Sequence, residues 1–241
     1  MRVAILSDIH GNLTAFEAVL ADLRQCSPDL VLHGGDLADS GSSPTEIVDR
    51  IRSLGWQGVM GNTDEMLVDP SSLEDFARHS SAPPNLWTGV RQIASATRDT
   101  LGEERLAWLR ELARVKTLEG FGLVHASPES CWQAPASEAT RAELETIYGS
   151  LGRPVVVFGH THRPFIRDVA AYPKLLINTG SVGLPHDGDP RASYLILQDG
   201  TPSIRRVEYN MEKELRALAS CGLPGATWTA KMLRTSSPQM P

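Results

Sequence analysis

The sequence predicts an α/β fold in which parallel strands present polar residues at one edge of a sheet. In the first 62 residues, three short apolar runs alternate with two segments of helical periodicity. This β-α-β-α-β order is typical of parallel strands with helices packed outside them. Each run passes directly into polar residues, and ligand sites in such folds lie beyond the carboxyl ends of the strands.

Local signals place the elements of the first third. Apolar residues at three- and four-residue spacing from Leu13 to Leu23 predict a helix. Asn12 is either the N-cap of that helix or a hydrogen-bond partner for a phosphate or a ligand. Ser43 to Glu46 has the form of a capping box, and Gly55 stands where the second helix would end. Strands are expected over residues 3–6, 30–32 and 57–60.

The remaining chain shows fewer regular patterns. Residues 64–117 are expected to be less regular, with a loop at Pro83-Pro84 and a helix over 100–112. Further predictions are strands over 121–124, 154–158 and 174–177, a hairpin over 194–207 that turns at Asp199-Gly200, and a helix over 210–219. We expect a single domain over residues 1–241, with a frayed tail over 235–241.

Composition excludes several classes of protein. The net charge of −6 argues against a stable nucleic-acid partner, which would need a basic face. Three cysteines without metal or disulfide spacing indicate free thiols and a cytoplasmic location. No apolar run approaches the roughly 18 residues of a membrane span, so no membrane association is expected. The sequence is compatible with an oligomer.

Histidine supplies the sharpest chemical signal. Four of the seven histidines directly follow predicted strands, as do two aspartates and one asparagine. Side chains at the ends of parallel strands converge, and burying so many polar groups without a metal would be costly. Two carboxylates, two dications and one hydroxide sum to a charge of +1, which suits a phosphate ester. The predicted ligands are Asp8, His10, Asp36, Asn62, His125, His160 and His162.

The ordered blocks of these residues resemble those of the calcineurin-like metallophosphoesterase superfamily. The blocks are Asp8-x-His10, Gly35-Asp36, Gly61-Asn62-x-Asp64, His125 and Gly159-His160-x-His162. Residues 178–183 resemble the small bacterial and archaeal branch of that superfamily. The resemblance implies a four-layer α-β-β-α sandwich, in which two mixed sheets lie between helices.

The resemblance also implies how the ligands are shared. One metal would take Asp8, His10 and His162, the other Asn62, His125 and His160, and Asp36 would bridge them. The nitrogen and oxygen donors suit manganese, iron, nickel or zinc without choosing among them. A hydroxide bridging the two divalent ions would attack phosphorus in line. The residues expected to take part in catalysis are Asp36, Asn62, His125 and Asn12.

We therefore expect a hydrolase of phosphomonoesters or phosphodiesters that acts on a small substrate, for which a nucleotide is one candidate. Two alternatives remain at this point: a metal-bound interaction scaffold with little activity, and a protein phosphatase. The scaffold is kept open by Thr63, which stands where many family members have a histidine that protonates the leaving group. Asp39 would normally orient that histidine and here lacks it. Poor leaving groups should then react slowly unless another residue supplies the proton.

Other polar residues have competing interpretations. His33 is expected to be a buried strand residue outside the ligand set, and His79 a solvated loop residue. His186 fits a surface turn, although it could reach the substrate. Arg163 and Arg191 could bind phosphate, or each could form a structural ion pair.

Overall fold

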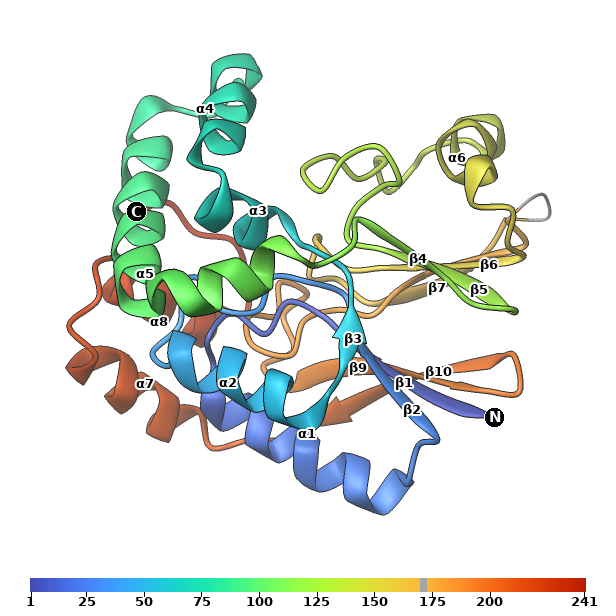
Figure 1. The fold of residues 1–241 in the computed structure, drawn as a ribbon, viewed down its shortest axis with the longest axis horizontal. Helices are drawn as coiled ribbons and strands as arrows, with labels where there is room; N and C mark the ends of the chain where they lie inside the picture. Colours follow the sequence, from blue (N-terminus) through green and yellow to red (C-terminus); the bar gives the residue numbers. More distant parts are fainter. Residues whose placement is uncertain (170–172) are drawn as a thin grey trace.

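The computed structural model describes residues 1–169 and 173–241. Two five-stranded mixed sheets face each other, and helices cover their outer faces (Figure 1). The strand orders are β10-β9-β1-β2-β3 and β4-β5-β6-β8-β7. This arrangement confirms the predicted four-layer sandwich.

The first sheet contains the predicted β-α-β-α-β unit. Its strands are β1 (Arg2–Leu6), β2 (Leu30–His33), β3 (Gln57–Gly58), β9 (Ala192–Gln198) and β10 (Thr201–Val207). β1, β2 and β3 are parallel, and β9 joins β1 antiparallel. The β9–β10 hairpin turns at Asp199-Gly200 as predicted, and both residues have positive φ.

The second sheet has a parallel centre and antiparallel edges. Its strands are β4 (Val115–Thr117), β5 (Phe121–Val124), β6 (Val155–Phe158), β7 (Phe165–Asp168) and β8 (Leu175–Asn178). β5, β6 and β8 are parallel, whereas β4 and β7 pair antiparallel at the edges. The sequence did not predict β4 and β7, because these short, partly exposed strands lack an apolar run.

Alternation along the central strands explains the layers. Val3 and Ile5 of β1 enter the core between the sheets, whereas Ala4 and Leu6 enter the core beneath the helices. In β6, Val155 and Val157 face the first sheet, and Val156 and Phe158 face the opposite core. A strand that is apolar on both faces can only be buried on both, which explains the uninterrupted apolar runs.

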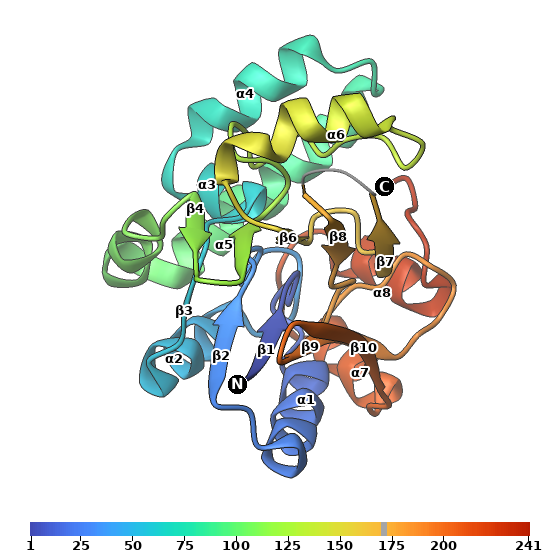
Figure 2. The same cartoon turned by 90° about the vertical axis from the view of Figure 1, so that its right-hand side faces the viewer.

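Helices cover both outer faces. α1 (Leu13–Cys26) and α2 (Pro44–Leu54) pack on the outer face of the first sheet, and α7 (Met211–Ser220) packs against α1. α6 (Arg141–Tyr148) lies over the second sheet (Figure 2). α8 (Ala226–Thr235) packs against α7. Gly55 ends α2 in the left-handed conformation, as predicted. The predicted capping box is wrong, because Ser43 makes no capping hydrogen bond and its hydroxyl lies against that of Ser42.

Residues 64–117 are more regular than the sequence predicted. Most of this segment forms α3 (Asn62–Val68), α4 (Pro70–His79) and α5 (Pro84–Arg110). Pro84 occupies the first helical position of α5, where the missing N–H costs nothing, so it begins a helix there. The backbone of α5 breaks at Gly102, and the predicted helix over 100–112 corresponds to its final part.

The C-terminal tail is packed where fraying was expected. Thr235 is the last residue of α8, and the buried Ser236 accepts a hydrogen bond from the Gly188 backbone through its carbonyl. Trp228 Nε1 donates to the Gln239 carbonyl at 2.7 Å. All three cysteines are free thiols. Within the described ranges, no helix is both long enough and apolar enough to span a membrane.

His33 is an unusual core residue at the end of β2. Its side chain is fully buried, and neither ring nitrogen has a hydrogen-bond partner. Burial, followed by the nearby charge of Lys116, lowers the pKa of His33 to about 4. The folded protein therefore holds this ring neutral.

Replacing His33 should change how stability depends on pH. The pKa of His33 in the folded protein lies below the ordinary value of about 6.5. The neutral ring therefore contributes fully to the stability of the folded protein above pH 6.5, and this contribution is lost as pH falls toward 4. Between pH 7 and pH 5, this one group should lower the free energy of unfolding by about 2 kcal/mol. Urea unfolding of metal-free wild-type and His33→Leu proteins at both pH values measures the difference. An equal loss in both proteins would contradict the assignment.

Candidate metal centre

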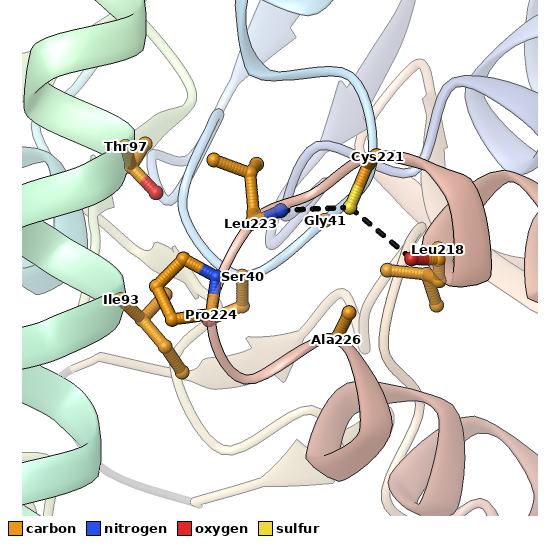
Figure 3. A pocket seen from close by; sticks show the side chains of 9 residues that line it. All are labelled: Ser40, Gly41, Ile93, Thr97, Leu218, Cys221, Leu223, Pro224 and Ala226. Atoms are coloured by element: carbon orange, nitrogen blue, oxygen red, sulfur yellow. Dashed lines mark hydrogen bonds between the residues drawn. The ribbon is translucent and has the colours of Figure 1, made fainter.

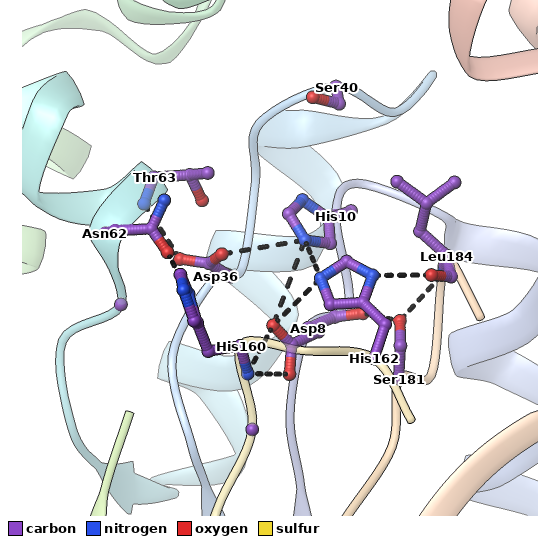
Figure 4. Close-up of polar contacts among 12 residues, drawn as sticks. Asp8, His10, Asp36, Ser40, Asn62, Thr63, His160, His162, Ser181 and Leu184 are labelled. Atoms are coloured by element: carbon purple, nitrogen blue, oxygen red, sulfur yellow. Dashed lines mark hydrogen bonds and ion pairs between the residues drawn. The ribbon is translucent and has the colours of Figure 1, made fainter. Parts of the chain in front are cut away.

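The carboxyl ends of the central strands bring the predicted ligands to one place. Asp8 follows β1 and Asp36 follows β2, while His125 follows β5. His160 and His162 lie in the loop after β6 (Figure 4). The two sheets meet here, since the Asp8 carboxylate accepts a hydrogen bond from the His160 backbone N–H at 3.1 Å.

One group of donor atoms forms around Asp8. The donor atoms of Asp8, His10, Asp36 and His162 all lie within 4.8 Å of one another, and all four residues are buried. His162 Nε2 lies 3.2 Å from Asp8 Oδ1, and His10 Nε2 lies 3.6 Å from Asp36 Oδ2. This spacing fits one small cation.

A second group forms around Asn62. Its Oδ1 lies 3.0 Å from His125 Nε2 and 2.8 Å from His160 Nδ1. His125 Nε2 is also 3.4 Å from Asp36 Oδ2, the same oxygen that faces His10. Asp36 therefore lies between the two groups.

Backbone carbonyls fix the orientation of three imidazoles. Nδ1 of His10 lies 3.1 Å from the Asp39 carbonyl, that of His125 2.7 Å from the Gly34 carbonyl, and that of His162 2.5 Å from the Leu184 carbonyl. A carbonyl can only accept, so each Nδ1 carries the hydrogen. In the neutral ring, Nε2 is then a free lone pair directed at the centre, which is the usual arrangement of metal-binding histidines.

Two of these lone pairs face each other. Nε2 of His10 and Nε2 of His162 are only 3.2 Å apart. With both Nδ1 atoms protonated, the neutral rings have no hydrogen to place between them. A proton on one ring or a cation beside both removes the repulsion. The donors are nitrogen and oxygen without thiolate, a set that fits a divalent transition metal.

The buried carboxylates also require a nearby positive charge, from a proton or a cation. Burial opposes the charge of Asp36, but His125 and His10 outweigh it and lower the pKa of this carboxyl. Burial likewise opposes a charged His125, yet Asp36 raises the pKa of His125 to about 10. Burial and then His125 lower the pKa of His160 to about 4. Without a cation, the carboxylates thus favour the doubly protonated, charged form of the His125 ring. Metal binding would release the second proton.

The backbone at the site is strained. Nine non-glycine residues in the described ranges have positive φ, and five of them are predicted ligands: Asp8, His10, Asp36, His160 and His162. Left-handed conformations are uncommon for such residues and gather at functional sites. No sequence pattern predicted this feature.

Asp64 holds the strained Asp36 turn. Its buried carboxylate accepts hydrogen bonds from the backbone N–H groups of Asp36, Leu37 and Gly61 at 2.8–3.0 Å. The Thr63 backbone N–H donates to Asp36 Oδ1 at 2.8 Å. Asp64 thereby connects the loops after β2 and β3.

The C-terminal helices brace the loop that follows Asp36. Thr229 Oγ1 donates to the Ser40 carbonyl at 2.8 Å, and Ser42 Oγ donates to the buried Glu214 at 2.7 Å. Figure 3 shows the crevice where the α7–α8 connection meets this loop and α5. Residues beyond the hairpin therefore help to position Asp36.

The side chain of Asn12 has a structural role. Its Oδ1 accepts from the Ala15 backbone as an N-cap, and its Nδ2 donates to the Gly183 carbonyl at 2.9 Å. The residue is 2% exposed. This geometry supports the N-cap interpretation and not the predicted contact with substrate.

Thr63 and Asp39 carry unpartnered atoms. Thr63 Oγ1 and Asp39 Oδ1 are buried without hydrogen-bond partners. Burial raises the pKa of Asp39 to about 7, against the hydrogen bond that Ser40 Oγ donates to Asp39 Oδ2 at 2.8 Å. These atoms agree with the absence of the family's histidine at position 63.

His186 lies closer to the centre than a surface turn would place it. Its ring stacks on that of His162, with centroids 4.3 Å apart and planes at 20°, so the surface-turn prediction is wrong. Burial, followed by the charge of His162, lowers the pKa of His186 to about 2. The position of His186 follows from the course of the loop, which the sequence could not provide.

The remaining polar residues singled out in the sequence make structural contacts. Arg191 forms an ion pair with Asp189 at 2.7 Å, and Arg163 Nε donates to the His186 carbonyl at 3.0 Å. His79 is the last residue of α4, not a loop residue. It stays exposed, as predicted, and its Nδ1 lies 2.9 Å from the Asp75 carbonyl.

The loop after β8 supports the site, a role that the sequence did not predict. Ser181 Oγ donates to the Asp8 carbonyl at 2.6 Å and accepts from the Leu184 backbone N–H at 2.7 Å. A Cβ at Gly183 would lie 1.7 Å from the Ile9 carbonyl oxygen. The glycines and the serine within residues 178–183 could have indicated this support, because small residues permit a close approach of two backbone segments.

Gly183→Ala should weaken metal binding, because the new methyl must displace the backbone between Asp8 and His10. We expect at least about a tenfold loss of affinity, comparable to the loss of an outer-shell contact. Elemental analysis after dialysis against graded manganese measures it. Gly149→Ala is the matched control, since its Cβ would meet nothing within 4 Å. Unchanged affinity in Gly183→Ala would contradict the proposed support.

Comparison with known proteins agrees with this geometry. The sequence model described as the calcineurin-like phosphoesterase superfamily domain matches residues 1–200. An uncharacterized protein of Methanocaldococcus jannaschii is 30% identical over 243 residues, with 92% of this chain and 93% of that protein covered. The crystal structure of a metallophosphoesterase from Sphaerobacter thermophilus has a TM-score of 0.78 at 28% identity, covering 98% of this chain and 99% of that one.

A third relative carries a named activity. A symmetrical bis(5′-nucleosyl)-tetraphosphatase of Aromatoleum aromaticum is 28% identical over 156 residues, and the match covers 61% of this chain and 52% of that enzyme. The family model spans most of the chain, including every predicted ligand. The predicted resemblance is therefore confirmed, and this chain belongs to the calcineurin-like phosphoesterase superfamily.

Proposed function

We propose that the protein is a phosphoester hydrolase with a dinuclear metal centre. One metal would be held by Asp8, His10 and His162, and the other by Asn62, His125 and His160. The observation that carries the proposal is the position of Asp36 Oδ2, which lies 3.6 Å from His10 Nε2 and 3.4 Å from His125 Nε2. A single carboxylate oxygen that faces both groups is suited to bridge two cations.

Two bound divalent cations would supply Lewis acidity and a nucleophilic hydroxide at neutral pH. The chain's own residues then orient the centre. The carbonyls of Asp39, Gly34 and Leu184 hold three imidazoles with Nε2 inward. Manganese, iron, nickel and zinc all suit these donors.

We further propose a small phosphoester substrate, a monoester or a diester of nucleotide type. Family membership and the tetraphosphatase relative support this class. Free thiols support a reducing compartment such as the cytoplasm. The interlocked cores of the two sheets support one domain.

Substituting the shared carboxylate tests the centre. Asp36→Asn should lower metal occupancy below two and reduce kcat/KM by at least about a hundredfold, since a neutral amide cannot bridge two dications. Bis-p-nitrophenyl phosphate and p-nitrophenyl phosphate with manganese or nickel distinguish diesterase from monoesterase activity. The exposed Asp99→Asn is the control. Two bound metals without turnover of either ester would favour a scaffold over an enzyme.

Restoring a histidine tests the missing proton donor. Thr63→His should raise the hydrolysis of alkyl phosphoesters about tenfold or more, because alkoxide leaving groups need a proton. Aryl esters, whose leaving groups are weak bases, should change less. Paired rates on methyl and p-nitrophenyl esters give the comparison. Equal gains on both would refute a role in protonating the leaving group.

A further inference from the structure

A groove opens beside the metal centre. It has a volume of about 590 Å³ and lies between the end of α4 and residues 132–135. Its lining includes Phe76, His79, Trp132, Gln133, His160 and Thr161. Because His160 also contacts Asn62 in the second ligand group, a molecule in the groove would reach that group directly.

The side chains that line the groove indicate which class of ligand it would bind. The described residues that line the groove offer aromatic rings, two imidazoles, an amide and hydroxyls, but no lysine, arginine, aspartate or glutamate. A second phosphate there would lack the cationic partners that phosphates usually have. A planar, uncharged ring with hydrogen-bonding edges would stack on the aromatic side chains and pair with the amide.

Ring contacts and hydrogen bonds hold the aromatic wall, formed by Phe76 and Trp132, in place. The rings of Phe76 and Trp132 stack with centroids 4.9 Å apart, and Trp87 meets the edge of Phe76 at 5.8 Å. Trp132 Nε1 donates to Glu65 Oε2 at 2.7 Å, and Arg114 pairs with the other oxygen of Glu65. A wall that is already ordered loses little conformational entropy when a ligand binds.

We propose that this groove binds the nucleobase of a nucleoside phosphoester whose phosphate lies at the metal centre. An outer face of the stacked Phe76–Trp132 pair is the stacking surface, and the exposed Gln133 is the hydrogen-bonding partner for the base edge. The volume lies in the range of small-molecule sites. The inference rests on the proposed phosphoesterase function for the position of the phosphate.

Binding of hydrolysis-resistant analogues tests the groove. Three 5′-methylenephosphonates, with CH₂ in place of the ester oxygen, share ribose and carry adenine, phenyl or no ring. Calorimetry on the manganese-loaded protein should show the adenine analogue binding about tenfold tighter than the ring-free one, with the phenyl analogue between them. Equal affinity of the adenine and ring-free analogues would overturn the proposal, and equal affinity of the adenine and phenyl analogues would overturn nucleobase recognition.

Variants identify the residues. Trp132→Leu should bring the adenine preference close to unity, and Gln133→Ala should reduce it about threefold without disturbing the core. Trp228→Leu, which alters a tryptophan under the C-terminal tail, should retain the wild-type preference. A preference unaffected by either groove variant would also overturn the proposal.

The measurement separates this inference from the proposed function. Turnover of p-nitrophenyl esters without adenine preference would remove the base site and leave the hydrolase. Adenine binding that depends on Trp132, without turnover of any ester, would remove the hydrolase and keep the groove.

Discussion

The burial of Asp8 and Asp36 at the ends of adjacent parallel strands is the constraint on which the rest of the site depends. Carboxylates in so dry a place need positive charge close by, and the surrounding side chains are imidazoles directed inward by backbone carbonyls. His125 holds a proton when no cation is present. The site is therefore organised around a charge that a metal ion can supply.

Keeping these groups together involves backbone strain and many supports. Five predicted ligands adopt left-handed conformations, each of which costs of order 1 kcal/mol. The Asp64 carboxylate, the Ser181 hydroxyl and the helices α7 and α8 hold the loops that carry them. The surrounding fold, including residues beyond the family domain match at 1–200, maintains the strained geometry.

The groove beside His160 is the part of the fold to which we assign recognition of the substrate. Its wall comes from α4 and the loop after β5, segments outside the motif blocks. Glu65 links the two parts, because it lies in α3 just after Asn62 and orients Trp132.

The sequence by itself determined the central strands, the layer order implied by the motifs, and the seven residues that meet at the strand ends. The strands and the polar residues that follow them are local or periodic features, because an apolar run that ends in a polar residue marks a buried strand and its edge. The layer order was implied by the resemblance to the superfamily. At Asn12 the sequence left two interpretations open, and the hydrogen bond from the Ala15 backbone supports the N-cap.

Only the tertiary structure decided the helices of 64–117, the stacking of His186 on His162, and the supports from Ser181 and Glu214. Each depends on contacts between segments far apart in the chain, and the path of a loop in space leaves no periodic trace in its residues. Strain at Asp8 and Asp36 is likewise imposed from outside, since isolated aspartates favour other conformations.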